Sequence, residues 1–313
     1  MSTILVTGQF SEENAERIRH AAANREVRFI SKLAPGDDGL ADVEAIAGTI
    51  NARHLSQAPK LKWVHSWAAG ADNDLFPEML TSPVVLTSST GNGAIPLAEH
   101  SMLLMLMLNR NVPRWMHAQT EKRWDRFTHP ELNGLTVGIF GLGNSGSDLA
   151  LKAKAFHMRV LGLRRNVGRT VEGVDQMFSM DQFHEFLSAS DFVVVTTPST
   201  PDTLGVFDAA AFKAMKPGAY FICISRGGIA DDDALLQALR EGWIAGAGLD
   251  AHGIEPLPAD SPFWSLPNVI VTPHNGATTP GTAQRSVEIF VDNLTRYVAG
   301  QPLRNVVDKQ AGY

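Results

Sequence analysis

The sequence predicts an α/β fold of two doubly wound parallel-sheet domains, with one domain inserted into the other. The chain has 313 residues, more than one ordinary domain requires. Short apolar runs typical of strands alternate with helical patterns along nearly the whole chain, which indicates parallel sheets joined by crossover helices. A glycine-rich strand–turn–helix signature, G-x-G-x-x-G, lies in the middle of the chain rather than near its start.

The expected strands fall into two groups, separated by helical and irregular sequence. The first group is Ile4–Thr7, Val27–Ile30, Gly48–Asn51, Trp63–His65 and Val84–Thr87. The second group is Thr136–Phe140, Val160–Leu163, Phe192–Thr196, Tyr220–Ile224, Gly246–Leu249 and Val269–Thr272. Between them we expect a long apolar helix from Leu97 to about Arg110, with Glu99 in its first turn, and then a segment rich in Trp and Arg.

The last expected helix runs from about Pro280 to Ala299 and stops at Gly300, a typical C-terminal cap. The apolar tail after it, Leu303 to Val307, is expected to dock on the first group of strands.

The central glycine motif has the context of a dinucleotide site. Gly141 permits the tight turn after the strand, Gly143 lets a pyrophosphate approach the backbone, and Gly146 lets the next helix pack closely. Asn144 and Ser145 open that helix, where free N–H groups and the positive end of the dipole attract phosphate. The strand before the motif, the helix after it and the second strand that follows favour dinucleotide binding; the alternative is a glycine-rich turn without a ligand.

Because this motif is central, the two domains are not consecutive. We expect residues 98–280 to form a Rossmann-like dinucleotide-binding domain. Residues 1–97 and 281–313 are expected to form the substrate-binding, flavodoxin-like domain around it.

Composition restricts the partners. Hydrophobic residues make up 44% of the chain and charged residues 19%, as in a globular protein, and the net charge of −6 argues against nucleic acid or a membrane surface. The one cysteine, Cys223, excludes a disulfide framework and favours a cytoplasmic location. The longest apolar run, Met102 to Leu108, is too short to span a bilayer. No group of His, Asp or Glu has metal-ligand spacing, so we expect no metal.

Three polar residues follow expected strands of the second group. Arg226 precedes two glycines, Glu255 precedes Pro256, and His274 follows a proline. Ligands of open α/β sheets bind at the carboxyl ends of the strands, which is where these loops lie. His65 and His100 fall instead on apolar elements and are expected to be hydrogen-bonded structural residues.

With these residues in register, the chain resembles the D-isomer-specific 2-hydroxyacid dehydrogenase family over essentially its whole length. The motifs that carry the resemblance are the central G-x-G-x-x-G, Thr196-Thr197-Pro198 with Pro201-Asp202-Thr203, Ser225-Arg226-Gly227-Gly228, Glu255-Pro256-Leu257-Pro258 and Thr272-Pro273-His274. The resemblance implies an oxidoreductase similar to the glyoxylate and hydroxypyruvate reductases, working on a small 2-oxo acid. It also suggests a homodimer, for which the apolar helix and the Trp/Arg-rich segment are the expected interface.

The resemblance implies that Arg226, Glu255 and His274 are catalytic. A guanidinium can bind the carboxylate of a 2-oxo acid through its planar fork. An imidazolium at His274 can supply the proton that the reduced ketone oxygen needs, and a nearby Glu255 would favour the charged ring and fix its tautomer. By the same resemblance, the N–H groups around Ala69, Gly70 and Ala71 join Arg226 in holding the substrate carboxylate.

The resemblance also implies further cofactor contacts. They are Thr197, Pro198, Thr203, Ile224, Asp250 and Gly276, with Asp250 close to the nicotinamide carboxamide.

The sequence departs from an NAD-type site at one place. Such a site has Asp or Glu after its second strand to bind the ribose 2′-hydroxyl, whereas here Leu163 is followed by Arg164 and Arg165. Two cations attract a 2′-phosphate, and Arg169 adds a third, so we expect NADPH rather than NADH; the alternative is that both arginines point to solvent.

The sequence therefore predicts an NADPH-dependent reductase that converts a 2-oxo acid to a D-2-hydroxy acid. The formate dehydrogenase branch of the family lacks the glutamate, so Glu255 argues against it. A redox-sensing regulatory protein that binds NAD(P)(H) without turnover is the alternative from another class. Trp67 and Trp264 either shape the substrate pocket or pack in the core.

Overall fold

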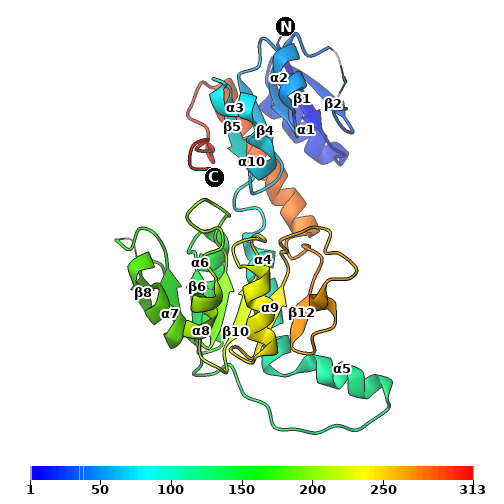
Figure 1. The fold of residues 1–313 in the computed structure, drawn as a ribbon. Helices are drawn as coiled ribbons and strands as arrows, with labels where there is room; N and C mark the ends of the chain where they lie inside the picture. Colours follow the sequence, from blue (N-terminus) through cyan, green and yellow to red (C-terminus); the bar gives the residue numbers. More distant parts are fainter. Residues whose placement is uncertain (1, 35, 38, 169, 313) are drawn as a thin grey trace. The chain divides into compact units, whose positions relative to one another are not determined.

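The computed structural model describes residues 2–34, 36–37, 39–168 and 170–312. They form two compact units, the first from residues 1–93 and 279–313 and the second from residues 94–278. Each unit is an α/β structure around its own parallel sheet (Figure 1).

Unit 1 has a five-stranded sheet in the order β2-β1-β3-β4-β5. Every neighbouring pair is parallel. This is the flavodoxin-like strand order. The strands are β1 (Thr3–Thr7), β2 (Glu26–Ile30), β3 (Val43–Ala47), β4 (Trp63–Ser66) and β5 (Val85–Ser88).

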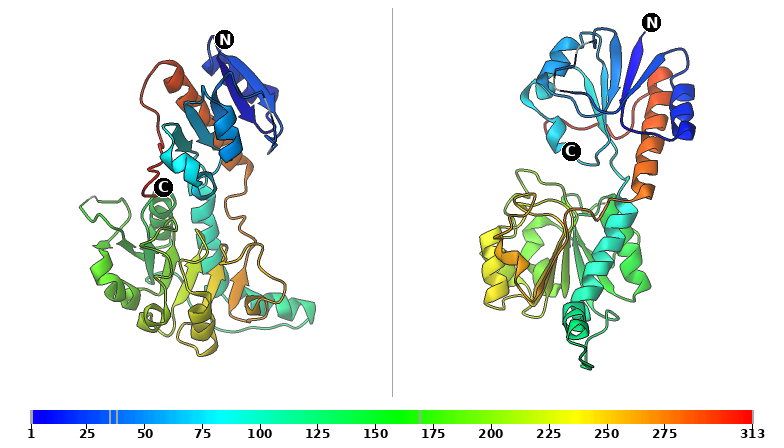
Figure 2. Two further views of the ribbon diagram at one scale, coloured as in Figure 1. Left: turned by 45° about the horizontal axis from the view of Figure 1, so that its top comes forward. Right: turned by 90° about the vertical axis from the view of Figure 1, so that its right-hand side faces the viewer.

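The helices of unit 1 cover both faces of this sheet. They are α1 (Glu12–Ala21), α2 (Ala52–Gln57), α3 (Pro77–Thr81) and α10 (Pro280–Val298), with a short 3-10 turn, η1 (Asp72–Asp74). α1 and α10 come from opposite ends of the chain and pack side by side (Figures 1 and 2). Alternation along β1 explains the two cores, because Ile4 and Val6 pack with Phe290 of α10 while Leu5 packs with Met79 of α3.

Unit 2 has a seven-stranded parallel sheet in the order β12-β11-β10-β9-β6-β7-β8. The strands are β6 (Thr136–Phe140), β7 (Arg159–Leu163), β8 (Gln176–Phe178), β9 (Phe192–Val195), β10 (Tyr220–Cys223), β11 (Gly246–Leu249) and β12 (Val269–Val271). The strand order reverses between β6 and β9, and such a switch point is where open α/β sheets bind nucleotides.

Two helical layers enclose this sheet. α4 (Ala94–Asn109) and α6 (Asn144–Ala155) bury one face, and α7 (Phe183–Ala189), α8 (Ala209–Ala214) and α9 (Asp232–Arg240) bury the other (Figure 2). The remaining elements are α5 (Val112–Thr120), η2 (Met180–Gln182) and η3 (Pro262–Trp264). The two-domain parallel-sheet fold that the sequence predicts is therefore confirmed.

Several details of the expected elements are wrong. The third strand of unit 1 is Val43–Ala47 and not Gly48–Asn51. Gly48 begins the turn instead, with φ +147°, and a Cβ there would lie 2.1 Å from Thr7 Oγ1. The strand was missed because it carries Glu44 and two alanines, which are poor strand formers.

The long helix also begins earlier than expected, at Ala94, so that Glu99 is not in its first turn. Pro96 fits there because the first helical turn needs no backbone donor. The helix ends at Asn109, and Asn111 with φ +49° separates it from α5, which the sequence did not predict. β8, which is only three residues long, was also missed. The docking of the apolar tail is confirmed, because Val306 bridges Thr87 and the Val307 N–H bonds Leu86 O at 2.9 Å.

Candidate active site

The glycine motif forms the turn between β6 and α6. Gly141 has φ +105°, and a Cβ on it would lie 2.6 Å from Thr197 Cγ2. A Cβ on Gly146 would lie 2.1 Å from Gly141 O, so only glycine lets the helix start so close to the strand. A Cβ on Gly143 would meet open space, which leaves room for a ligand against the backbone.

The start of α6 is suited to an anion. Gly143 is its N-cap and has no side chain, so the first-turn N–H groups donate to no capping side chain. Asn144 is exposed and Ser145 half-buried at this end of the helix. Free donors and the helix dipole together fit a pyrophosphate.

The loop after β9 forms the other side of the switch point. Thr197 Oγ1 is buried and has no hydrogen-bond partner among the described residues. Buried polar atoms normally have a partner, so this hydroxyl is a candidate ligand contact. The loop is folded on itself: Thr203 Oγ1 donates to Pro198 O at 2.9 Å and accepts from Thr200 N at 2.8 Å. Ile224, at the end of β10, is buried in the core.

Arg164 and Arg165 lie directly after β7, as expected. Arg164 is half-buried and Arg165 is exposed, with Arg165 Nη2 2.9 Å from Asp202 Oδ2 of the loop after β9. This ion pair connects the ends of β7 and β9. Arg169 lies outside the described residues.

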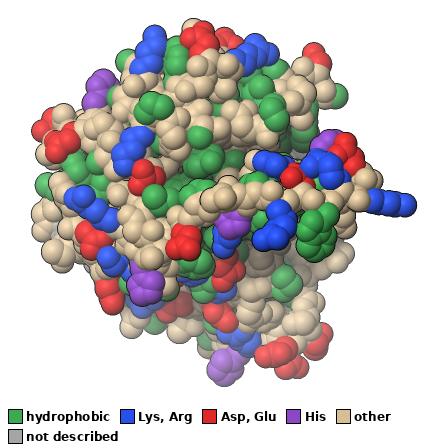
Figure 3. Space-filling model, turned by 90° about the horizontal axis from the view of Figure 1, so that it is seen from below, with side chains coloured by type: hydrophobic (Ala, Val, Ile, Leu, Met, Phe, Trp, Pro, Cys, Tyr) green, Lys and Arg blue, Asp and Glu red, His purple; other side chains and the backbone are tan. Residues whose placement is uncertain are grey.

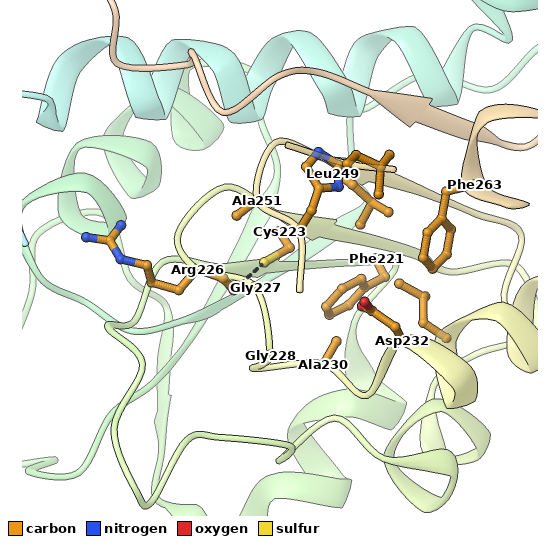
Figure 4. Close-up of a pocket in the computed structure, with 13 residues that line it drawn as sticks. Phe221, Cys223, Arg226, Gly227, Gly228, Ala230, Asp232, Leu249, Ala251 and Phe263 are labelled. Carbon is orange, nitrogen blue, oxygen red and sulfur yellow. Dashed lines mark hydrogen bonds between the residues drawn. The ribbon is translucent and has the colours of Figure 1, made fainter. Parts of the chain in front are cut away.

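Arg226 follows β10 on a loop that contacts the loop after β11. A Cβ on Gly227 would lie 1.8 Å from His252 O, so the two loops touch only because this residue is glycine. The Cys223 thiol donates to Arg226 O at 3.4 Å, and burial raises the pKa of that thiol to about 11. Figure 4 shows a small cavity behind this loop, with the Arg226 side chain directed away from it. The Arg226 guanidinium therefore does not point into this cavity.

Glu255 and His274 form a hydrogen-bonded pair between the loops after β11 and β12. His274 Nδ1 lies 2.9 Å from Glu255 Oε1 and 2.7 Å from Oε2, and the His252 N–H donates to Oε1 at 2.9 Å. Burial acts to raise the pKa of Glu255, but the His252 N–H bond and the bond and charge of His274 outweigh it, so that the pKa lies below its usual 4.5. The carboxylate holds Nδ1 and leaves Nε2 of His274 for another partner.

Asp250 supports the loop that carries His274. Its fully buried carboxylate accepts from Thr272 Oγ1 at 2.6 Å, Asn275 N at 3.1 Å and Gly276 N at 3.0 Å. A Cβ on Gly276 would lie 2.8 Å from Asp250 Oδ2. His274 itself has φ +50°, an uncommon backbone conformation. The hydrogen bonds from Asn275 N and Gly276 N to Asp250 stabilise this conformation.

The expected substrate loop lies in unit 1, directly after β4. Ala69 is exposed, Gly70 half-buried and Ala71 buried. Trp67 packs in the core against Phe290, and its Nε1 donates to Thr7 O at 3.0 Å. Packing therefore accounts for Trp67.

Sequence reasoning did not predict several supporting contacts. Thr272, Asp202 and His252 carry polar contacts at the site. Thr272 and Asp202 stand in motifs that carry the family resemblance, but the sequence assigned no contact of its own to any of the three. His65 is buried and bonded to Thr87 and Ser89, and its burial lowers its pKa to about 3. His100 Nε2 lies 3.0 Å from Thr272 Oγ1. Both histidines are thus hydrogen-bonded structural residues, as expected.

Within the described ranges, no group of three or more His, Cys, Asp or Glu side chains is arranged to hold a metal ion. The helices in the described part of the chain also include none long and apolar enough to cross a bilayer.

Comparison with known proteins identifies the family of the chain. Residues 102–276 match the sequence profile described as D-isomer specific 2-hydroxyacid dehydrogenase, NAD binding domain. A glyoxylate reductase of Pyrococcus furiosus is 33% identical over 282 residues, covering 86% of this chain and 83% of that protein. A D-3-phosphoglycerate dehydrogenase of Archaeoglobus fulgidus is 32% identical over 262 residues, covering 83% of this chain but only 49% of that longer protein.

Solved structures are similar over the whole chain. An NADPH-dependent glyoxylate/hydroxypyruvate reductase of Sinorhizobium meliloti, in complex with NADP and sulfate, has 32% identity, a TM-score of 0.86 and 100% coverage of both chains. A D-isomer specific 2-hydroxyacid dehydrogenase of Xanthobacter autotrophicus, in complex with NADPH and MES, has 30% identity, a TM-score of 0.88 and 100% coverage of both.

Fold and site together define a nucleotide-binding α/β protein with a polar constellation at the carboxyl ends of its strands. The chain belongs to the D-isomer-specific 2-hydroxyacid dehydrogenase family.

Proposed function

We propose that the protein is an NADPH-dependent oxidoreductase that reduces a 2-oxo acid to the D-2-hydroxy acid. The observation that carries this proposal is the His274–Glu255 pair, held at the carboxyl ends of the strands in the same unit as the glycine motif. When bound, the nicotinamide supplies the hydride to the ketone carbon.

Arg226 is the proposed ligand of the substrate carboxylate. Its guanidinium presents a planar fork that matches a carboxylate, and it can also polarise the adjacent ketone oxygen. In unit 1, the N–H groups of Ala69, Gly70 and Ala71 are also proposed to bind a substrate carboxylate. An anionic substrate is thereby fixed at one end while the ketone remains free to react.

His274 is the proposed proton donor in reduction. Its Nε2–H gives its proton to the ketone oxygen, and the alcohol forms as the ring becomes neutral. Glu255 stabilises the protonated ring and orients it through Nδ1, because its carboxylate oxygens lie 2.9 and 2.7 Å from that atom. Asp250 is proposed to act through the backbone of Asn275 and Gly276, which keeps the His274 loop in place.

The residues present fit a bound dinucleotide. Gly143 leaves space at the start of α6, and the Thr197 hydroxyl after β9 has no hydrogen-bond partner within the described part of the chain. Arg164 and Arg165 are the proposed ligands of the 2′-phosphate, which makes NADPH the preferred form over NADH. The S. meliloti and X. autotrophicus structures contain NADP and NADPH, which supports this preference.

Glyoxylate and hydroxypyruvate are the proposed leading substrates, because the full-length relatives include reductases of these acids. The test is a panel of 2-oxo acids assayed with NADPH and with NADH. Turnover of glyoxylate or hydroxypyruvate with NADPH supports the proposal. Tight NADPH binding without turnover of any 2-oxo acid would contradict it and favour the redox-sensing alternative.

A homodimer is the proposed assembly, and the surface around α5 supports it. Most of the apolar face of α4 is buried on its own sheet, since Met102, Leu104 and Met105 lie in the core. Exposed apolar side chains remain beyond it, with Trp124 91% exposed and Met116 58% exposed. Figure 3 views this end of unit 2 and shows hydrophobic side chains beside a projecting segment that bears Lys and Arg. Exposed aromatic surface of this kind is typical of interfaces.

A cytoplasmic location remains part of the proposal, since the single cysteine, Cys223, is free and buried.

A further inference from the structure

Four consecutive carbonyl groups, beginning with that of Ser66 at the end of β4, are held by one short segment of unit 1. Ser89 donates from its N–H to Ser66 O at 3.0 Å and to Ala68 O at 2.9 Å. Thr90 Oγ1 donates to Ala69 O at 2.9 Å, and Asn92 Nδ2 donates to Trp67 O at 3.5 Å. The carbonyls of residues 66–69 therefore all turn toward residues 89–92.

This arrangement fixes the direction of the amide groups. In a trans peptide the C=O of one residue and the N–H of the next point in opposite directions. The N–H groups of residues 67–70 must then point away from residues 89–92. Successive N–H groups on one side of a turn form a concavity that attracts anions. Ala68 and Ala69 are exposed, so the turn lies at the surface of unit 1.

The segment that holds the turn is itself secured. Asn92 is buried and its Nδ2 donates to Ser286 Oγ of α10 at 2.8 Å, while Arg285 Nε donates to Asn92 O at 2.5 Å. The backbone O of Thr90 accepts from Asn305 Nδ2 at 2.9 Å. The Thr90 hydroxyl thus reaches Ala69 from a fixed backbone.

We propose that Thr90 is a positioning residue for the substrate, supported by Asn92. Its hydroxyl holds the Ala69–Gly70 peptide so that the Gly70 N–H faces the carboxylate of the 2-oxo acid. The inference rests on the proposed function and deepens it, since it assigns the geometry of the carboxylate ligand to residues outside the loop itself.

The test is Thr90→Val, which keeps the shape of the side chain and removes the donor. Thr90→Ser keeps the donor. Thr295→Val is the matched control, because Thr295 is an exposed threonine of unit 1 whose Oγ1 also donates to a backbone carbonyl, Val291 O, at 2.9 Å. Each variant is titrated with oxamate, a carboxylate-bearing analogue of a 2-oxo acid, in the presence of NADPH, and assayed with glyoxylate.

For Thr90→Val we expect the oxamate Kd and the glyoxylate KM to rise by roughly five- to tenfold, the scale of one lost hydrogen bond. The Kd for NADPH and the kcat should stay within about twofold of wild type, and Thr90→Ser should restore the KM. Thr295→Val should match wild type throughout.

An unchanged oxamate Kd and KM in Thr90→Val, in an active wild-type background, would overturn this inference alone. The same rise in Thr90→Ser would overturn it as well, because the donor would then be irrelevant. A wild-type protein that turns over no 2-oxo acid defeats the proposed function, and this inference with it.

Discussion

Replacement of both Arg164 and Arg165 by alanine should remove the preference for NADPH. The two residues stand where an NAD-type site has an acid, directly after β7. Arg165 already has a partner in Asp202 at 2.9 Å, so binding a 2′-phosphate requires it to leave or share that ion pair.

The structure limits the size of the effect. The side chains of Arg165 and Asp202 are 65% and 75% exposed, and such an ion pair contributes about 0–1 kcal/mol. A hydrogen bond to a charged group contributes about 1.5–3 kcal/mol. The exchange therefore favours the phosphate by roughly 1–2 kcal/mol for Arg165, and the half-buried Arg164 adds to it. We expect the double variant to bind NADPH roughly 10- to 100-fold more weakly.

The assay is a titration of wild type and the double variant with NADPH and with NADH. The Kd for NADH should change by less than about twofold, because NADH has no phosphate at this position. Arg159→Ala is the matched control: Arg159 lies at the other end of β7 and its Nη2 bonds Gln176 Oε1 at 2.8 Å. A wild-type kcat/KM that is better with NADH, or an unchanged NADPH Kd in the double variant, would refute the reasoning.

Three further predictions concern the catalytic loops and the assembly. Glu255→Gln should lower the pH at which reductive kcat/KM declines, because the imidazolium loses its counter-charge. The lowered pKa of Glu255 also means that its carboxylate stabilises the fold above about pH 4.5 and loses that effect as pH falls further, so the gap in unfolding free energy between wild type and Glu255→Gln should shrink in acid. Gly227→Ala should cost about 1–3 kcal/mol of stability and most activity, since its Cβ would lie 1.8 Å from His252 O; thermal unfolding and a rate assay check this, and a wild-type-like variant would contradict it. Light scattering at micromolar protein should give about twice the 33.9 kDa chain mass, whereas the monomer mass would count against the dimer.

Much of the fold followed from the sequence because its signals are local. After their first residues, β6 and β7 are apolar and buried, and β9 is apolar throughout, as expected of strands buried on both faces. The glycine motif added a steric requirement, and the close approaches at Gly141 and Gly146 explain why glycine is needed there. The position of β3 was predicted wrongly because its alanines and Glu44 are poor strand formers. Pairing with the neighbouring strands β1 and β4 stabilises it as a strand.

The catalytic residues could be predicted from the sequence, but the contacts that support them could not. Loop order placed Arg226, Glu255 and His274 after neighbouring strands, since parallel strands end at one edge. The hydrogen bond from Asn275 N to Asp250 joins residues 25 positions apart in the chain. The bond from Thr90 Oγ1 to Ala69 O joins residues 21 positions apart. Pairing of this kind is set by tertiary packing, which no local pattern encodes.

Single-turnover kinetics can show whether His274 supplies the proton in reduction, because they isolate the chemical step from product release. The loss of NADPH absorbance after glyoxylate is mixed with the preformed NADPH complex should be compared between wild type and His274→Ala. We expect a rate lower by on the order of a hundredfold or more in the variant, with an unchanged Kd for NADPH. A variant that retains a near-wild-type rate and the wild-type pH profile would contradict it.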